Sequence, residues 1–339
     1  MAKNVVAIFG AGRIGKLHAE NIIRNLPDVK IKYIIDIFLT PEAEAWAKGL
    51  GVEHVLKDDA AVFADPEVDA ILIGSPTPTH SDLILKACAA KKDVFCEKPL
   101  DLDIDRIYST LEAVEKAGIK FMMGFVRRFD HNHRAVHDAV AAGKVGKPEL
   151  ITITSRDPAI APMEYIATSG GIYVDMMIHD FDMIRFLAMS EVVEVYAKGA
   201  CLVDPRVADY GDVDTAIVTL TFENGALGVI NNSRRANFYD QRTEVMGDLG
   251  CVQALNDTPN TVTVTTIDDV TSARPPWFFL ERYSDAFATE MTAFFEALNG
   301  GGEMPTNGND GLQSVLIAEA CNISAREGRP VKISEVARG

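Results

Sequence analysis

The sequence lacks long uninterrupted apolar runs. None of its apolar stretches approaches the length of about 20 residues that a membrane-spanning helix needs. At the N-terminus, Met1-Ala2-Lys3-Asn4 leads directly into an apolar strand, which leaves no room for a signal peptide. Low-complexity segments and internal repeats are also missing. These absences predict a cytoplasmic protein that is not bound to a membrane.

Paired cysteines are absent as well. The chain has five cysteines, an odd number, and no two of them form a Cys-x-x-Cys pair. This pattern favours reduced thiols in a cytosolic protein over a disulfide framework, and it disfavours a structural zinc site. The cysteines are Cys88, Cys96, Cys201, Cys251 and Cys321.

Positive charge is scarce. The 33 lysines and arginines are outnumbered by 49 acidic residues, so the formal net charge is −16. A surface of this sign argues against binding to nucleic acid or to anionic membranes, whereas a small neutral or cationic ligand remains compatible with it. The 339 residues, 47% of them apolar, are enough for two globular domains.

A dinucleotide-binding signature stands at the start of the chain. The apolar strand Val5-Val6-Ala7-Ile8-Phe9 is followed by the G-x-G-x-x-G run Gly10-Ala11-Gly12-Arg13-Ile14-Gly15, which opens a helix to about Asn25. The first glycine permits a tight turn, the second lets a pyrophosphate approach, and the third lets helix and strand pack closely. Free amides at the helix N-terminus attract the phosphates.

The next strand, Ile31–Ile35, ends at Asp36, about twenty residues beyond the glycines. A carboxylate at this place accepts hydrogen bonds from the adenine ribose and repels a 2′-phosphate. No arginine follows it nearby, because the next residues are Ile37 and Phe38. The sequence therefore predicts NAD rather than NADP as the cofactor.

Strands and helices continue to alternate up to Phe121-Met122-Met123, so residues 1–123 are predicted to form a doubly wound, parallel Rossmann domain. A strand ends at the loop Gly74–His80, whose Ser75, Thr77 and His80 are candidate cofactor residues. The alternative for His80 is a first-turn helix residue without chemistry.

Another strand ends at Glu97-Lys98-Pro99. The proline forces the backbone of Lys98 away from a helical conformation. A lysine that points into a cleft can hold a hydroxyl or a developing alkoxide by a charge-assisted hydrogen bond. The alternative is a surface lysine that pairs with Glu97.

After Gly124 the pattern changes to consecutive strands joined by turns. These predict an α+β domain over residues 124–339 with a large, mostly antiparallel open sheet. Glu223-Asn224-Gly225 predicts a hairpin turn between two of the strands. An open sheet face is a predicted subunit interface. The predicted strands are Leu150–Ser155, Val192–Ala200, Thr215–Phe222, Ala226–Ser233, Thr243–Met246, Cys251–Leu255 and Thr261–Thr266.

Within this half, two glycines open a segment with helical spacing that runs from Gly170 to Leu187. Asp175 and His179 are four residues apart, so on one continuous helix they share a face. A carboxylate beside an imidazole suits proton transfer near neutral pH. The alternatives are a helix cap with a core histidine, and a metal site made with Asp182. The metal reading is disfavoured because only one histidine is present.

These motifs together resemble the glucose–fructose oxidoreductase/inositol dehydrogenase family over nearly the whole length. The resemblance rests on the glycine loop, Glu97-Lys98-Pro99 and the Asp175/His179 segment. Further similar stretches are Gly124–Asp130, Ser155–Pro158, Asn232–Ala236 and Phe279–Tyr283.

The resemblance implies that Lys98, Asp175 and His179 are catalytic, with His179 as the general base. It adds Arg127, Asp157, Asp182 and Tyr239 as substrate residues, and a homotetramer built through the open sheets. The activity it implies is oxidation of one ring hydroxyl of myo-inositol to the ketone scyllo-inosose, with NAD as hydride acceptor. The cofactor residues expected in all are Gly10, Gly12, Arg13, Ile14, Gly15, Asp36, Ser75, Thr77, His80, Glu97 and Lys98.

Two other functions stay open. The same fold could oxidise another polyol or a pyranose, such as scyllo- or chiro-inositol or glucose, because the sequence does not give the pocket shape. A non-catalytic NAD-binding sensor is the second, although a sensor does not need an acid–base group such as His179.

Overall fold

The computed structural model describes residues 3–338, which form two compact units. The first unit runs to Phe129 and takes up Asp285–Gln313 from late in the chain. The second consists of Asp130–Ser284 and the residues from Ser314 onward. The predicted division at residue 123 stays a prediction, and each unit is described by itself below.

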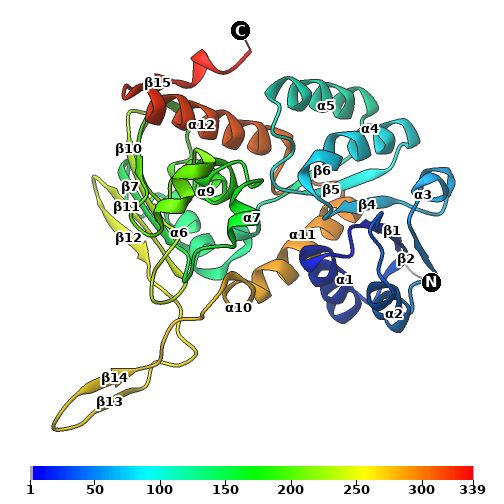
Figure 1. Cartoon of the computed structure of the whole chain (residues 1–339), viewed down its shortest axis with the longest axis horizontal. Coiled ribbons are helices and arrows are strands. Elements are labelled where there is room, and N and C mark those ends of the chain that lie inside the picture. Colours follow the sequence, from blue (N-terminus) through cyan, green and yellow to red (C-terminus); the bar gives the residue numbers. More distant parts are fainter. Residues whose placement is uncertain (1–2, 339) are drawn as a thin grey trace. The chain divides into compact units, whose positions relative to one another are not determined.

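The first unit is built on a six-stranded, fully parallel sheet in the order β3-β2-β1-β4-β5-β6 (Figure 1). Its strands β1, β4, β5 and β6 are mostly buried and nearly continuous in apolar residues, as expected for a parallel sheet covered on both faces, whereas the edge strand β3 is not buried. The chain reverses its direction of strand addition between β1 and β4, so ligands are expected beyond their carboxyl ends. The strands are β1 Asn4–Phe9, β2 Val29–Ile35, β3 His54–Leu56, β4 Ala70–Ile73, β5 Asp93–Glu97 and β6 Phe121–Gly124.

Helices alternate with these strands, as the sequence predicts, although the short β3 and α3 were not predicted. Asp103 caps α5 by accepting from two backbone amides, and Thr40 caps α2 ahead of Pro41. The late helix α11 returns to this unit, where Lys120 Nζ donates to the Ala297 carbonyl at 2.6 Å. The helices are α1 Arg13–Asn25, α2 Pro41–Gly49, α3 Ala60–Ala64, α4 His80–Ala90, α5 Ile104–Ala117 and α11 Ser284–Gly300, with 3-10 turns η1 Thr77–Thr79 and η2 Val126–Phe129.

The second unit contains a seven-stranded sheet in the order β12-β11-β7-β10-β9-β8-β15. Every pair is antiparallel except β7 and β10, which run parallel. The predicted hairpin joins β9 to β10, and Gly225 takes a φ of +87° there. The strands are β7 Pro148–Arg156, β8 Val192–Ala200, β9 Thr215–Phe222, β10 Leu227–Ser233, β11 Asp240–Gly247, β12 Gly250–Ala254 and β15 Val331–Lys332.

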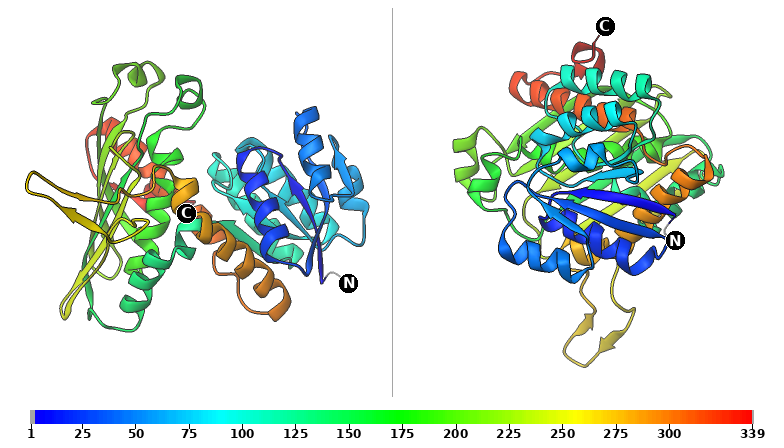
Figure 2. Two further views of the ribbon diagram at one scale, coloured as in Figure 1. Left: turned by 90° about the horizontal axis from the view of Figure 1, so that it is seen from below. Right: turned by 90° about the vertical axis from the view of Figure 1, so that its right-hand side faces the viewer.

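Helices cover one face of this sheet and leave the other open (Figure 2). On the covered face, Ser324 Oγ of α12 accepts from the Ala197 amide of β8 at 2.9 Å. On the open face, Tyr196, Ile217 and Leu227 are exposed by 36%, 53% and 54%. The helices are α6 His131–Ala141, α7 Met163–Ile166, α8 Ile172–Asp175, α9 Ile178–Ala188, α10 Phe279–Arg282 and α12 Gly308–Glu327, of which α12 belongs to this unit from Ser314 onward, with 3-10 turns η3 Pro205–Tyr210 and η4 Ile333–Glu335.

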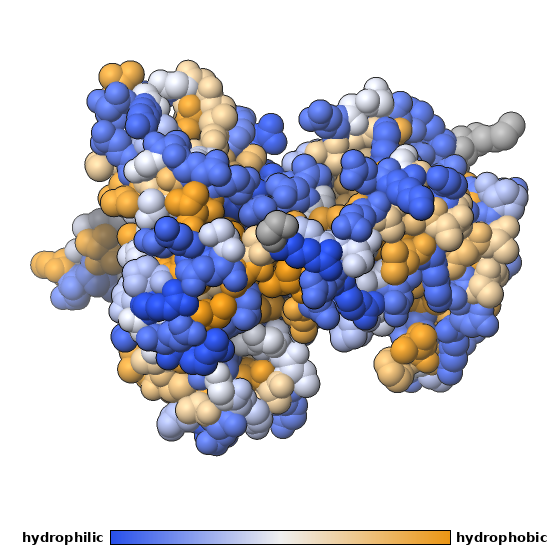
Figure 3. All heavy atoms as spheres, turned by 90° about the horizontal axis from the view of Figure 1, so that it is seen from above, coloured by the Kyte–Doolittle hydropathy of each residue, from blue (hydrophilic) through white to orange (hydrophobic). Residues whose placement is uncertain are grey.

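A hairpin of β13 (Thr263–Thr265) and β14 (Val270–Ser272) projects from the second unit, and β14 was not predicted (Figure 1). On the face drawn in Figure 3, hydrophilic side chains cover most of the surface, with apolar residues between them. All five cysteines are free. Among the described helices, none combines the length and the hydrophobicity that crossing a bilayer requires.

Candidate active site

The glycine loop after β1 is shaped by close backbone contacts. Gly10 has a φ of +99°, and a Cβ on it would lie 2.7 Å from the Gly74 carbonyl oxygen at the end of β4. A Cβ on Gly15 would lie only 1.9 Å from the Gly10 carbonyl oxygen. Both positions therefore require glycine, the first for its conformation and the packing of β1 on β4, the second for the packing of α1 on the loop.

Gly12 differs, because a Cβ there would meet nothing within 4 Å. Its lack of a side chain is explained by a ligand that approaches the backbone, as the pyrophosphate does in this motif. Gly12 is the N-cap of α1 and provides no side-chain cap, so the first amides of the helix can serve a phosphate. The loop therefore fits the diphosphate of a dinucleotide.

Asp36 follows β2 and is half-buried. Its Oδ2 accepts from the Ala11 amide at 2.7 Å, and its Oδ1 accepts from the Phe38 amide at 2.8 Å. These bonds fix the carboxylate beside the glycine loop while each oxygen keeps a further lone pair for a ribose hydroxyl. Arg13 is exposed at the start of α1, and Ile14 is half-buried.

The loop after β4 is tied together by its own side chains. Ser75 Oγ and Thr79 Oγ1 lie 2.6 Å apart, and Thr77 is half-buried. His80 begins α4 and is 1% exposed, with Nδ1 2.8 Å from the Pro99 carbonyl oxygen and Nε2 2.8 Å from the Ser75 carbonyl oxygen. Burial lowers the pKa of His80. This imidazole therefore joins the ends of β4 and β5, and its direct contact with the cofactor stays a prediction.

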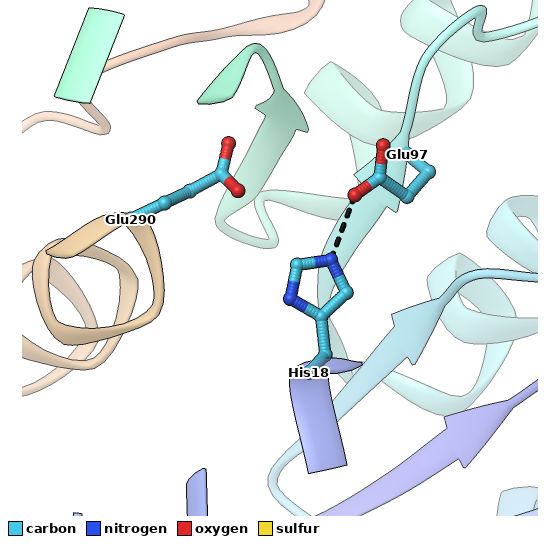
Figure 4. A group of neighbouring side chains, drawn as sticks. All are labelled: His18, Glu97 and Glu290. Atoms are coloured by element: carbon cyan, nitrogen blue, oxygen red, sulfur yellow. Dashed lines mark hydrogen bonds and ion pairs between the residues drawn. The ribbon is translucent and has the colours of Figure 1, made fainter. Parts of the chain in front are cut away.

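Lys98 comes directly after β5 and is half-buried, as is Glu97. The Glu97 carboxylate lies 2.7 Å from His18 Nε2 of α1 (Figure 4). This contact places Glu97 in an ion pair or hydrogen bond with a histidine that the sequence analysis did not single out. Arg127, the predicted substrate residue of this unit, lies in η2 and is 5% exposed.

The segment with Asp175 and His179 does not form the single helix that its apolar spacing predicted. Instead, α8 ends at Asp175 and α9 begins at Ile178, with a turn at Met176 and Met177. The Met177 amide donates to the Ile172 carbonyl, one residue farther back than in an α-helix. The prediction of one continuous helix is therefore wrong, whereas the placement of Asp175 and His179 at a common site stays a prediction. Both side chains are half-buried.

Asp175 is held by two side chains from other segments. Tyr165 Oη donates to its Oδ1 at 2.6 Å, and Arg234 Nη1 donates to its Oδ2 at 3.1 Å. Arg234 also donates to Asp212 at 3.4 Å and is 2% exposed. Desolvation of its hydroxyl and the negative charge of Asp175 raise the pKa of Tyr165. This network fixes the Asp175 carboxylate, which lies four residues before His179 in the sequence.

Arg234 lies within Asn232–Ala236, one of the stretches that carry the family resemblance, but no role was predicted for it. In the structure, Gly228, Ile230 and Asn232 are buried and Arg234 continues this alternation, but the sequence of β10 does not alternate between apolar and polar residues and so did not reveal it. Tyr165 and Asp212 carry no local signal either. They reach Asp175 only through the tertiary structure.

Three further predicted substrate residues belong to the second unit. Asp157 directly follows β7 and is half-buried, and its amide donates to the Ser233 carbonyl at 3.0 Å. Asp182 is 1% exposed, with a carboxylate oxygen 3.9 Å from Arg185 Nη1. Tyr239 is 5% exposed and its ring lies 5.8 Å from that of Tyr283. Their contact with a substrate stays a prediction.

The glycine cradle, the placed Asp36 and the strand order define the first unit as the nucleotide domain of a dinucleotide-dependent oxidoreductase. Family comparison agrees with this class. Residues 5–125 match the model described as "Oxidoreductase family, NAD-binding Rossmann fold", and residues 133–253 match the GFO/IDH/MocA C-terminal domain. The chain belongs to this family of NAD-binding oxidoreductases, which confirms the predicted fold class and cofactor.

Relatives match along nearly the full length. An uncharacterised oxidoreductase of Bacillus subtilis is 48% identical over 98% of both chains. The myo-inositol 2-dehydrogenase of Thermotoga maritima is 44% identical over 98% of this chain and 99% of its own.

Solved structures of dehydrogenases also match the chain over nearly its full length. A probable dehydrogenase from Thermotoga maritima has a TM-score of 0.95 at 43% identity, covering 98% of this chain and 100% of that one. A scyllo-inositol dehydrogenase from Lactobacillus casei, solved with bound NAD(H) and scyllo-inositol, has a TM-score of 0.90 at 31% identity, covering 98% and 99%.

Proposed function

We propose that this chain is an NAD-dependent inositol 2-dehydrogenase that oxidises myo-inositol to scyllo-inosose. The observation that carries the proposal is the 44% identity to the myo-inositol 2-dehydrogenase of Thermotoga maritima over nearly the full length of both chains. Support comes from a half-buried His179 four residues after Asp175, whose carboxylate is held by Arg234.

The oxidation removes a hydride from one ring carbon and a proton from its hydroxyl. NAD, when bound, supplies the hydride acceptor. We assign the proton to His179, because an imidazole nitrogen is the commonest general base in enzymes and this side chain is half-buried. Lys98 would hold the hydroxyl oxygen and stabilise its developing charge.

Asp175 would orient His179 and balance the positive charge that the imidazole gains. Its carboxylate is fixed from two sides by Tyr165 and Arg234, so it is pre-organised rather than free to turn toward solvent. Arg127, Asp157, Asp182 and Tyr239 are the proposed substrate residues. Because Asp182 and Tyr239 are buried, their side chains suit packing beneath the substrate site as well as direct contact with the substrate.

The proposed NAD site uses Gly10 to Gly15 for the diphosphate and Asp36 for the ribose, in a domain of residues 1–123. Ser75, Thr77, His80, Glu97 and Lys98 would complete it at the ends of β4 and β5. Residues 124–339 would bind the substrate and form the oligomer.

The open sheet face supports a homotetramer as the proposed assembly. Its apolar side chains include Tyr196, Ile217 and Leu227, and such exposed apolar positions on a sheet are typical of an interface between copies. The five free cysteines support the proposed cytoplasmic location, where thiols stay reduced.

Scyllo-inositol oxidation is the second candidate. It is favoured by the structural likeness to the Lactobacillus casei scyllo-inositol dehydrogenase, but that protein is 31% identical, against 44% for the myo-inositol enzyme. The two substrates differ in the orientation of one hydroxyl, so a few side chains decide between them.

The test is NADH formation by the purified protein with myo-inositol, scyllo-inositol, D-chiro-inositol, glucose and xylose, each with NAD and with NADP. We expect fast turnover of myo-inositol with NAD alone. Preference for scyllo-inositol would select the second candidate. Turnover of glucose but not of any inositol would reject both. NAD binding without any turnover across the panel would favour a sensor.

A further inference from the structure

One histidine and two glutamates form an enclosed cluster inside the first unit. His18 lies in α1, Glu97 ends β5, and Glu290 lies in α11 (Figure 4). Each residue offers a ligand atom, and these three atoms lie within 4.8 Å of one another. His18 is 2% exposed and Glu290 is 0% exposed. The cluster therefore brings three potential metal ligands together from three separate elements.

Aromatic rings and backbone enclose the cluster. The His18 ring lies edge-on to Phe95 at 5.1 Å and to Phe287 at 5.8 Å between ring centroids. On another side, a Cβ at Gly124 of β6 would lie 3.1 Å from both the Glu97 carboxylate and the Phe95 ring. Such surroundings make an unbalanced charge costly, since apolar side chains cannot replace lost hydration.

The polar atoms of the cluster are unevenly satisfied. His18 Nε2 and a Glu97 carboxylate oxygen lie 2.7 Å apart. Among the residues that the structure describes, neither Glu290 carboxylate oxygen has a hydrogen-bond partner, and His18 Nδ1 has none either. The Glu290 side chain nevertheless extends toward the His18–Glu97 pair rather than away from it (Figure 4). A buried carboxyl group without a partner needs a reason, because an unmade hydrogen bond costs roughly 1–3 kcal/mol.

We propose that His18, Glu97 and Glu290 bind one divalent transition-metal cation, of which Zn²⁺ is the representative. One imidazole nitrogen and two carboxylate oxygens are a donor set that this ion accepts. Two carboxylates and a dication also leave the enclosed cluster without net charge. Ligand atoms about 2.0–2.2 Å from one tetrahedral zinc ion lie roughly 3.3–3.6 Å from one another. The His18 nitrogen and the Glu97 oxygen, now 2.7 Å apart, would therefore separate to admit the ion, and ligand atoms up to 4.8 Å apart would approach by about an ångström.

The sequence disfavours a zinc site made of cysteines, and this cluster contains none; its three protein ligands would leave one coordination position of the cation open. The bound cation would join α1, β5 and α11, and α11 belongs to the segment that enters this unit from late in the chain. It would also fix the end of β5, one residue before Lys98. The inference does not depend on the substrate, although it shares Glu97 with the proposed NAD site. Its test measures bound metal and thermal stability rather than turnover, so its failure is distinguishable from failure of the proposed function.

The other cluster of this kind, Asp130, His131 and Asp257, is a poorer candidate. The Asp130 carboxylate already forms an ion pair with the guanidinium of Arg282, which also lies 3.2 Å from an Asp257 oxygen. This fixed positive charge compensates the acids and would repel a cation. Among residues 3–338, by contrast, no side chain forms a hydrogen bond with the Glu290 carboxylate.

The experiment strips the full-length protein with a chelator, dialyses it against Zn²⁺ alone, and measures bound metal and the thermal midpoint. The test variant is Glu290→Gln, which has nearly the same shape as the acid but removes an anionic ligand. The matched control is Glu296→Gln, the same change at an exposed position of α11. We expect one Zn²⁺ per chain and a raised midpoint in the wild type and the control. In Glu290→Gln, affinity should fall by at least roughly 10-fold to 100-fold.

X-ray absorption of the zinc-loaded wild type keeps the test independent of how the variants fold. Nitrogen and oxygen ligands are expected, whereas sulfur ligands would place the ion on cysteines and overturn the proposal. Equal zinc binding by wild type and Glu290→Gln would also overturn it. So would a wild type that binds no zinc, which would leave Glu290 as a neutral buried acid. Inositol turnover by zinc-free protein would not bear on either result.

Discussion

The glycine loop of the first unit and the side chains around Asp175 in the second unit both stabilise negative charge, but they do so in different ways. The loop presents backbone amides, which six consecutive residues from Gly10 to Gly15 position by their own turn. The network presents side chains, and Tyr165, Asp212 and Arg234 come to Asp175 from separate segments. The first arrangement is local and depends on missing side chains. The second is long-range and depends on charges that must be present together.

The largest expected effect is at His179. In His179→Ala, we expect kcat/KM for the polyol to fall by about 10²–10⁴-fold because the proton acceptor is lost. NAD affinity, measured by fluorescence titration, should stay unchanged, since the amide cradle is in the other unit. His54→Ala, at an exposed histidine, is the control. Retained turnover in His179→Ala would remove the base assignment.

The second prediction tests the charge network. Arg234→Met leaves Asp175 and Asp212 without their shared cation, so the free energy of unfolding should fall by about 3 kcal/mol. Arg235→Met, at the exposed neighbouring arginine, should change it little. Chemical denaturation of both variants measures the difference. Equal midpoints would mean that the network is not needed for stability.

The third prediction separates two glycines of the same loop. Gly15→Ala places a Cβ 1.9 Å from the Gly10 carbonyl, so it should lower stability by about 1–3 kcal/mol. Gly12→Ala has open space and an ordinary backbone conformation, so it should keep the stability and weaken NAD binding alone. Thermal midpoints and NAD titrations of both variants provide the readout. Unchanged NAD affinity in Gly12→Ala would argue against a diphosphate there.

A smaller effect is expected at Asp36, whose carboxylate accepts a hydrogen bond from the Ala11 amide of the glycine loop. Asp36→Ala removes the repulsion of a 2′-phosphate, so the NADP-to-NAD ratio of kcat/KM should rise by roughly tenfold, about 1.4 kcal/mol. The variant should also loosen the loop, because the Ala11 and Phe38 amides lose their acceptor. The ratio, rather than either rate alone, is the measurement. A constant ratio would assign cofactor choice to other residues.

The smallest effect is a pH dependence of the second unit. Burial opposes ionisation of Asp130, but the hydrogen bonds and charge of Arg282 outweigh it and lower the pKa of Asp130. The ionised form therefore stabilises the fold above the unfolded-state pKa of about 3.9, and this contribution is lost as pH falls below it. In Asp130→Asn, denaturation midpoints between neutral pH and pH 3 should vary less than in the wild type. An equally steep decline in both would remove Asp130 as the cause.

Local pattern predicted most elements of both units, and it predicted the NAD loop with its acid. It failed where pairing or packing overrides periodicity. The parallel neighbours β7 and β10 are far apart in sequence, so no turn signal reports them. The apolar spacing through Met176 and Met177 suits one helix, yet the chain turns there, where the Met177 amide donates to the Ile172 carbonyl. No sequence motif predicts that His18 and Glu290 lie close to Glu97.

The sequence by itself determined the nucleotide loop, since a strand, three glycines and an acid act over a short stretch where backbone sterics decide the shape. It also determined which residue types are available for proton transfer. Only the tertiary structure decided that Arg234 and Tyr165 hold Asp175, and that Glu290 faces His18 and Glu97. These contacts join residues from distant segments, and their energy arises only once folding has removed water from between the charges.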